Sequence, residues 1–117
     1  AVARLVFGQL PDACKPEDYL VVGNFGVREP PPGARLDEHP VLDLVLLPGL
    51  AFDRTGGRLG WGRAFYDCLI PSLPGHPIRV GVAYDFQILD QNLPCQAHDQ
   101  PVDYLLTPGG YLKTQSI

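Results

Sequence analysis

The chain has 117 residues, a net charge of −4 at neutral pH and a sequence pI near 5.1. Hydrophobic residues make up 45% and charged residues 19%, a balance that predicts one packed domain over residues 1–117 and argues against wholesale disorder. The acidic balance gives no electrostatic support for a nucleic-acid partner. No apolar run reaches the roughly 18 residues that a membrane span needs, so a membrane partner is not expected either.

The cysteines give no sign of a disulfide framework or a zinc site. Cys14, Cys68 and Cys95 are widely spaced and contain no CxxC pair. The first residues also lack the basic start and long apolar core of a signal peptide. These features predict reduced thiols and a cytoplasmic location.

The N-terminal third contains two short strand candidates and a proline-rich connector. The apolar stretches Arg4–Phe7 and Tyr19–Val22 are the predicted strands. The segment Glu29–Gly33 reads EPPPG, and its consecutive prolines exclude a helix and predict a stiff, extended connector.

The rest of the chain has the order strand, loop, helix, strand, strand. Val41–Leu47 is a nearly continuous apolar run, typical of a strand buried on both faces of a parallel sheet. Pro48–Gly62 has five glycines and little periodicity, which predicts a loop. Further strands are predicted at Ile78–Tyr84 and Val102–Thr107. This order is typical of βαβ units and predicts an α/β fold with an open, mostly parallel sheet and flanking helices.

The helix between these strands is predicted from an apolar stripe. Phe65, Cys68 and Leu69 have the i, i+3, i+4 spacing of a helix that ends before Pro71 or Pro74.

The loop that leads into this helix is the predicted ligand site, because open α/β sheets bind ligands beyond the carboxyl ends of their strands. The loop ends in Gly60-Trp61-Gly62. Glycine has no Cβ, so phosphate oxygens can approach the backbone N–H groups closely. The first N–H groups of a helix have no partner inside it and favour an anion.

Charged residues in this region agree with a phosphate site. Arg54, Arg58 and Arg63 are three of the seven arginines of the chain. The planar guanidinium suits phosphate. Asp67 lies one turn after Arg63 and could hold magnesium beside a phosphate.

Other interpretations remain open at this stage. A single GxG often only makes a turn, and Arg63 with Asp67 could be a solvated surface pair. Trp61 could belong to the core. The motif GxxxxGK[ST] is absent, which excludes a P-loop nucleotide-binding protein. The residues alone therefore indicate a phosphate loop and no particular reaction.

Longer stretches of the sequence are more specific. LPGLAFDRTGGRLGWGRAFYD, at residues 47–67, resembles the signature of the 5-formyltetrahydrofolate cyclo-ligase family. FGVREP at residues 25–30, RVGVAYDFQ at 79–87 and LPCQAHDQPVDYLLTP at 93–108 resemble further elements of that family, in the expected order.

The resemblance implies a fold and a reaction. The fold would be related to the NagB/RpiA/CoA-transferase group. The reaction would be the ATP- and magnesium-dependent cyclisation of 5-formyltetrahydrofolate to 5,10-methenyltetrahydrofolate, with release of ADP and phosphate.

The resemblance also implies roles for individual residues. The ATP phosphates would be wrapped by residues 58–66, and magnesium would be held by Asp67 and Asp99. Arg63 and Tyr66 would be the catalytic residues, the segment Trp61–Phe65 would also face the folate, and His98 would only be a neighbour. The phosphate-binding set is Arg58, Leu59, Gly60, Trp61, Gly62, Arg63, Ala64, Phe65 and Tyr66.

The chain departs from the family pattern in three places. Ala64 stands where the family usually has a third glycine, and Cys68 stands where an arginine is common. Residues 1–24 lack the N-terminal helix that carries a Lys/Arg pair, so the chain corresponds to about the C-terminal two-thirds of the family fold. One sheet face is therefore expected to be uncovered, and a homodimer would cover it. The alternative is a shortened, catalytically weak module that binds nucleotide, folate or a partner protein.

Overall fold

The structure is a computed structural model that describes residues 7–13, 15–34, 36, 40–60, 65–94 and 99–115. The chain forms two compact units, Ala1–Pro40 and Val41–Ile117. One domain over the whole chain stays a prediction. Within the described ranges, no helix is both long enough and apolar enough to cross a membrane.

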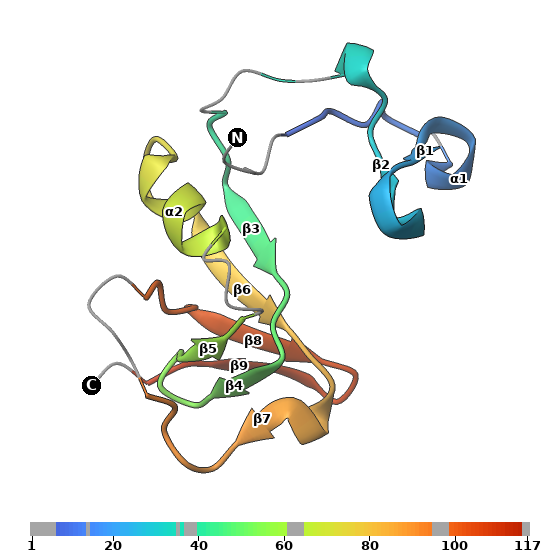
Figure 1. Cartoon of the computed structure of the whole chain (residues 1–117). Coiled ribbons are helices and arrows are strands. Elements are labelled where there is room, and N and C mark those ends of the chain that lie inside the picture. Colours follow the sequence, from blue (N-terminus) through green and yellow to red (C-terminus); the bar gives the residue numbers. More distant parts are fainter. Residues whose placement is uncertain are drawn as a thin grey trace. The chain divides into compact units, whose positions relative to one another are not determined.

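The first unit consists of a short helix and a two-stranded hairpin (Figure 1). Helix α1 (Pro16–Tyr19) begins at a proline, whose fixed φ suits the first turn. Strands β1 (Val21–Val22) and β2 (Arg28–Glu29) pair antiparallel. The turn between them contains Phe25 and Gly26, both in the left-handed region at φ 60° and 73°.

The predictions for the first unit are confirmed only in part. The strand prediction at Tyr19–Val22 holds for its last two residues, because Tyr19 ends helix α1. Most of the predicted strand Arg4–Phe7 lies outside the described residues. The prediction of an extended connector over Glu29–Gly33 is wrong at its C-terminal end. There Pro32–Ala34 forms a 3-10 turn, in which the Ala34 amide donates to the Pro31 carbonyl. Proline opens such a turn because its missing N–H is not needed there.

The second unit is built on a four-stranded sheet in the order β3-β6-β8-β9 (Figure 1). Strands β3 (Leu44–Leu47), β6 (Ile78–Val82) and β8 (Tyr104–Thr107) run parallel, and β9 (Gly110–Lys113) pairs antiparallel with β8. The predicted α/β class and the mostly parallel sheet are therefore confirmed. The carboxyl ends of β3, β6 and β8 meet at one edge, where such sheets bind ligands.

One face of this sheet carries the core of the unit. Leu47, Phe52 and Leu105 are at most 1% exposed. Gly81 in β6 makes room for the aromatic ring, because a Cβ there would lie 2.5 Å from Cε1 of Phe52. The buried apolar residues of the unit are Val45, Leu47, Phe52, Ile70, Leu73, Val80, Ala83, Val102 and Leu105. Of these, Val80 lies on the opposite face of the sheet, because it pairs with Leu46.

The other face carries exposed apolar side chains. Leu44 and Leu46 of β3 are 47% and 57% exposed, so the prediction that this strand is buried on both faces is wrong. The strand instead alternates, with Val45 and Leu47 buried on the core side. The register places Ile78, Val82 and Leu106 on the same side as Leu44 and Leu46. Val80 on the same face is only 8% exposed, so this face is exposed in part, and a wholly uncovered face stays a prediction.

A second, smaller sheet interrupts the predicted loop Pro48–Gly62. Strands β4 (Ala51–Asp53) and β5 (Arg58–Leu59) form an antiparallel hairpin, and β7 (Ile88–Leu89) pairs parallel with β4. The prediction of a continuous loop is therefore wrong. Strands of two or three residues are too short to show a hydrophobic period in the sequence.

Helix α2 (Phe65–Ser72) ends before Pro74, as predicted, with Pro71 inside its last turn. The predicted stripe is wrong, because Cys68 is exposed and Leu69 only half-buried. Ile70 and the following Leu73 are the buried residues, at 3% and 5% exposure. The family's usual arginine would therefore occupy an exposed position here.

Candidate functional site

A tight turn between β4 and β5 presents the first residue of the site, Arg58. The carboxylate of Asp53 closes this turn, since its Oδ1 accepts hydrogen bonds from the Thr55 amide, the Thr55 hydroxyl and the Gly57 amide at 2.6–2.9 Å. This is a local side-chain turn of the kind that Asp favours. Gly56 has φ +96°, a conformation that requires glycine.

Asp53 is also tied to a distant part of the chain. It is 1% exposed, and its Oδ2 accepts a 2.6 Å hydrogen bond from the amide of Leu93. Burial alone would raise the pKa of this carboxyl, but the hydrogen bonds from Thr55, Leu93 and Gly57 outweigh it and hold the pKa of Asp53 below its ordinary value of 3.8. Asp53 is therefore charged in the folded protein at neutral pH.

This lowered pKa predicts an acid-sensitive contribution to stability. A group with a lowered folded-state pKa stabilises the protein above its unfolded pKa, and that contribution is lost as the pH falls from 3.8 through the lower folded value. We expect the difference in unfolding free energy between wild type and Asp53→Asn to be largest near neutral pH and to shrink below 3.8. Urea unfolding at a series of pH values measures it. A difference that stays constant down to the acid end contradicts the prediction.

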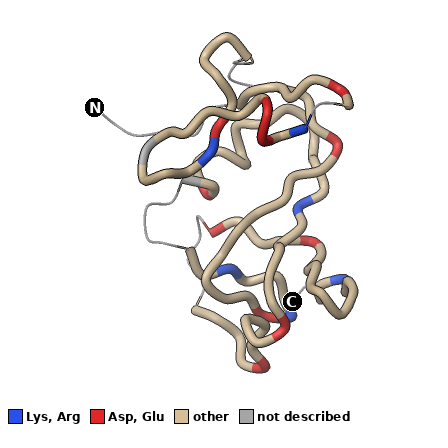
Figure 2. Tube along the Cα trace, turned by 90° about the vertical axis from the view of Figure 1, so that its right-hand side faces the viewer, with Lys and Arg blue, Asp and Glu red and all other residues tan. Residues whose placement is uncertain are grey.

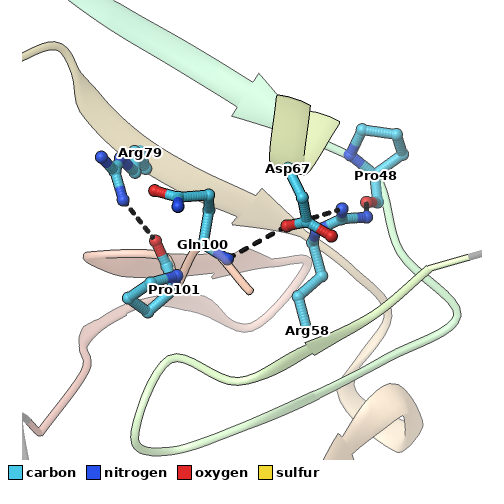
Figure 3. A network of polar contacts seen from close by, with 6 residues as sticks. All are labelled: Pro48, Arg58, Asp67, Arg79, Gln100 and Pro101. Atoms are coloured by element: carbon cyan, nitrogen blue, oxygen red, sulfur yellow. Dashed lines mark hydrogen bonds and ion pairs between the residues drawn. The ribbon is translucent and has the colours of Figure 1, made fainter. Parts of the chain in front are cut away.

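Arg58 is the centre of a buried polar cluster (Figure 3). Its side chain is only 6% exposed. Nη1 donates a 2.9 Å hydrogen bond to the carbonyl oxygen of Pro48, Nη2 lies 3.8 Å from Oδ1 of Asp67, and the guanidinium carbon lies 5.3 Å from the centroid of the Tyr66 ring. The guanidinium has five N–H donors, more than these contacts require.

Two glycines of the motif make room for this arginine. A Cβ at Gly60 would lie 3.1 Å from Nη1 of Arg58, and one at Gly49 would lie 3.1 Å from its Cγ. Gly60 was expected to open the backbone to phosphate, and it also leaves space for the guanidinium. Gly60 thus lies close to the Arg58 guanidinium, while Gly49 is closest to the Phe52 ring, whose Cζ would lie 2.8 Å from an added Cβ.

Asp67, in the first turn of α2, joins three segments. Its Oδ1 accepts a 3.0 Å hydrogen bond from the Gln100 amide and also faces Arg58 (Figure 3). The Asp67 side chain is 17% exposed. Because Gln100 follows Asp99 directly, this contact brings the backbone of the second predicted metal ligand next to the first. The structure thus gathers Arg58, Tyr66 and Asp67 beside the segment that carries Asp99.

The loop after β3 connects this cluster to a cavity. Gln87 donates from Nε2 to the carbonyls of Gly49 and Leu50, at 3.2 and 3.0 Å, while its Oε1 accepts from the Tyr84 amide. The cavity has a volume of about 490 Å³ and lies at the carboxyl ends of β6 and β8. It is lined by Val82, Ala83, Tyr84, Gln87, Leu106, Thr107 and Pro108.

Several predicted site residues lie outside the described part of the chain. These are Trp61, Gly62, Arg63 and Ala64, together with the neighbour His98. Leu59 lies in β5 and is half exposed, at 50%. Sequence reasoning missed Asp53 and Gln87, although the run Asp-x-Thr-x-Gly is a recognisable signal for a side-chain-closed turn.

The Asp67 carboxylate suits a hard cation such as magnesium. Magnesium is commonly held by one or two carboxylates together with phosphate oxygens and waters, and the Asp67 side chain is 17% exposed beside Arg58. Among the described residues, no group of three or more His, Cys, Asp or Glu side chains is gathered. Figure 2 shows acidic and basic positions interspersed along the described trace, so attraction for an anion here depends on local groups such as Arg58.

Fold and site together define an α/β protein with an arginine–carboxylate cluster beyond the carboxyl end of a parallel strand, the usual ligand position in this class. The sequence profile of the 5-formyltetrahydrofolate cyclo-ligase family matches residues 4–108. The chain belongs to this family.

Individual relatives agree with this assignment. The chain is 38% identical to the 5-formyltetrahydrofolate cyclo-ligase of Mycolicibacterium smegmatis, over 76% of this chain and 46% of that protein. It is 34% identical to the 5-formyltetrahydrofolate cyclo-ligase of Escherichia coli K12, over 80% of this chain and 52% of that protein. The solved structure of Aquifex aeolicus 5,10-methenyltetrahydrofolate synthetase matches with a TM-score of 0.70 at 36% identity, over 97% of this chain and 56% of that one. The chain thus spans about half the length of these relatives.

Proposed function

We propose that this chain carries the phosphate-binding part of a cyclo-ligase that converts 5-formyltetrahydrofolate to 5,10-methenyltetrahydrofolate with ATP. Family membership over residues 4–108 and the similarity to cyclo-ligases of Mycolicibacterium smegmatis and Escherichia coli support the proposal. The observation that carries it is the cluster of Arg58, Asp67 and the Gln100 amide. A buried arginine facing a carboxylate is the combination that a magnesium–phosphate group can use.

In the proposed reaction the formyl oxygen attacks the γ-phosphorus of ATP, and the bond to the leaving ADP breaks. The N10 nitrogen then attacks the activated formyl carbon and gives up its proton. The C–O bond breaks as phosphate departs with the former formyl oxygen. Phosphoryl transfer of this kind depends mainly on positioning and on neutralising charge.

The residues of this chain would divide that work. Arg58 and Arg63 would contact the phosphate oxygens, with Tyr66 holding the guanidinium of Arg58 against its ring. Asp67 and Asp99 would hold magnesium, which supplies positive charge to the phosphates when bound. Residues 59–65 complete the proposed phosphate and folate contacts.

The cavity beside Gln87 is the proposed place for a flat ring of one of the two substrates. Its apolar walls and the exposed Tyr84, stacked on Phe86 at a centroid distance of 5.8 Å, suit an aromatic heterocycle. A NagB/RpiA-like ancestry of the fold, a homodimer through the apolar sheet face and a cytoplasmic location complete the proposal. The compartment differs among relatives, since the Arabidopsis thaliana protein is named mitochondrial.

The direct test is the absorbance of the methenyl product. The chain is mixed with 5-formyltetrahydrofolate, ATP and magnesium, and the methenyl chromophore is followed over time. Controls omit ATP or replace magnesium with EDTA, and both are expected to remain silent. Binding of ATP and folate without turnover would instead favour the weak binding module. Absence of binding to both would contradict the proposal.

A further inference from the structure

One turn of the second unit contacts several of the segments that form the proposed site. The turn runs from Asp53 to Gly57 and leads directly into Arg58. Its Asp53 carboxylate accepts from the Leu93 amide at 2.6 Å, and its Gly56 carbonyl accepts from the Val102 amide at 2.9 Å. In the sequence, Leu93 and Val102 lie on either side of Asp99 and Gln100.

The contact at Val102 is close enough to fix the backbone of its neighbours. A Cβ at Gly56 would lie 2.5 Å from the Val102 carbonyl oxygen, so the two backbones touch. Gln100, two residues earlier, donates to Asp67. The Gly56 contact thus reaches a residue two positions after Gln100, and Gln100 in turn donates to Asp67.

The Asp53 carboxylate is buried and fully hydrogen-bonded, so it can hold two segments together. It is 1% exposed and accepts four hydrogen bonds, three on Oδ1 from its own turn and one on Oδ2 from Leu93. A buried charge is stable only when it is satisfied in this way. Oδ1 thus holds the turn that leads into Arg58, and Oδ2 holds the backbone at Leu93.

We infer that Asp53 is a positioning residue of the proposed site, which sets the spacing between Arg58 and the Asp99–Gln100 segment. This inference rests on the proposed function for its catalytic meaning. Asp53 touches no substrate in this assignment and acts through the backbone. Residues that hydrogen-bond directly to metal ligands are worth about 10–100-fold in metal affinity, and for Asp53, which acts one step further out, the low end of this range is expected.

The variant Asp53→Asn separates the hydrogen bonds within the turn from the hydrogen bond to Leu93. The amide oxygen can keep the three bonds on the turn, so Arg58 stays in place. The NH2 group then faces the Leu93 amide, which is also a donor, and that bond is lost. The variant therefore releases the Leu93 amide while the turn before Arg58 keeps its hydrogen bonds.

The first measurement is ATP affinity by calorimetry, with saturating magnesium and with EDTA. In Asp53→Asn the gain in affinity that magnesium provides is expected to fall about 10-fold, while the affinity in EDTA stays near that of wild type. Asp90→Asn is the matched control, because the Asp90 side chain is 93% exposed and its ion pair, at 3.6 Å, is with the exposed Arg54 and not with Arg58. Its magnesium gain is expected to equal that of wild type. A folded Asp53→Asn variant with an unchanged gain overturns the inference.

The second measurement does not need nucleotide. Amide exchange by NMR is expected to show loss of protection at Leu93 and Gln100 in Asp53→Asn, with Thr55 and Gly57 still protected. Unchanged protection at Gln100 overturns the inference, whether or not the chain binds ATP. A wild-type chain that binds no ATP would count against the proposed function alone.

A milder pair of variants covers the case in which Asp53→Asn does not fold. Thr55→Val removes the 2.6 Å hydroxyl bond to Asp53, and Thr55→Ser keeps it. Thr55→Val is expected to lower the magnesium gain and the protection of Gln100, and Thr55→Ser to restore both. Equal behaviour of the two variants overturns the inference.

Discussion

Arg58→Ala is expected to lower the rate of methenyl formation by about 100-fold or more, because it removes the buried cation proposed to face the transferring phosphate. The guanidinium is 6% exposed, so its charge is poorly screened by water and acts strongly on a nearby anion. The rate is measured from the absorbance of the product at saturating ATP and folate. Arg58→Lys is expected to recover only part of it, since an ammonium cannot reproduce the planar fork.

The same variant tests stability. Removing Arg58 leaves Asp67 without its 3.8 Å ion-pair partner and the Pro48 carbonyl without its donor. Loss of one partner of a largely buried pair typically costs about 3–5 kcal/mol, and about 2–4 kcal/mol is expected here because the pair is long and Asp67 is partly exposed. Urea unfolding measures this cost separately from the rate.

Arg54→Ala is the matched control. Arg54 lies on the same hairpin turn, but its side chain is 54% exposed and its partner Asp90, at 3.6 Å, is 93% exposed. Exposed pairs of this kind contribute less than about 1 kcal/mol, so the control is expected to change neither stability nor rate appreciably. An equal loss of activity in the two variants would contradict a specific role for Arg58.

The long elements of the second unit could be predicted because their sequence patterns are strong. Strands β3, β6 and β8 follow from apolar runs of four or more residues. Helix α2 was predicted from the stripe Phe65, Cys68 and Leu69, which located the helix but not its buried side. The short strands β4, β5 and β7 could not be predicted, because two or three residues show no period and their pairing depends on partners far along the chain.

Which side of each element is buried was harder to predict than whether the element is a helix or a strand. Cys68 has the spacing of a core residue, yet the helix turns it to the surface and buries Ile70 instead. Leu44 and Leu46 look like core residues of a two-sided strand and are exposed. Apolar identity predicts that a residue can be buried, and only the packed neighbours decide whether it is.

The site was predicted through its motif, and the structure adds the reason for part of that motif. Arg58, Tyr66 and Asp67 were expected at a phosphate site and do gather, at 5.3 and 3.8 Å from the arginine. Asp53 was missed because its decisive partner, Leu93, is 40 residues away. No local pattern predicts a backbone amide as the partner of a distant carboxylate.

Asp67→Asn is expected to abolish most of the magnesium dependence of ATP binding while the fold remains. The asparagine oxygen can still accept from the Gln100 amide, so the 3.0 Å link between the segments survives. The negative charge that a hard cation needs is lost. Because even outer partners of metal ligands are worth about 10–100-fold in metal affinity, the magnesium gain in ATP affinity is expected to fall at least that much.

The control for this variant is Asp90→Asn. It removes a carboxylate that is 93% exposed and forms an ion pair with Arg54 at 3.6 Å. It is expected to bind MgATP like the wild type. Calorimetry with and without magnesium measures both variants. If Asp67→Asn keeps the full magnesium gain, the carboxylate serves only to hold Arg58 and Gln100, and the metal must be held by other groups.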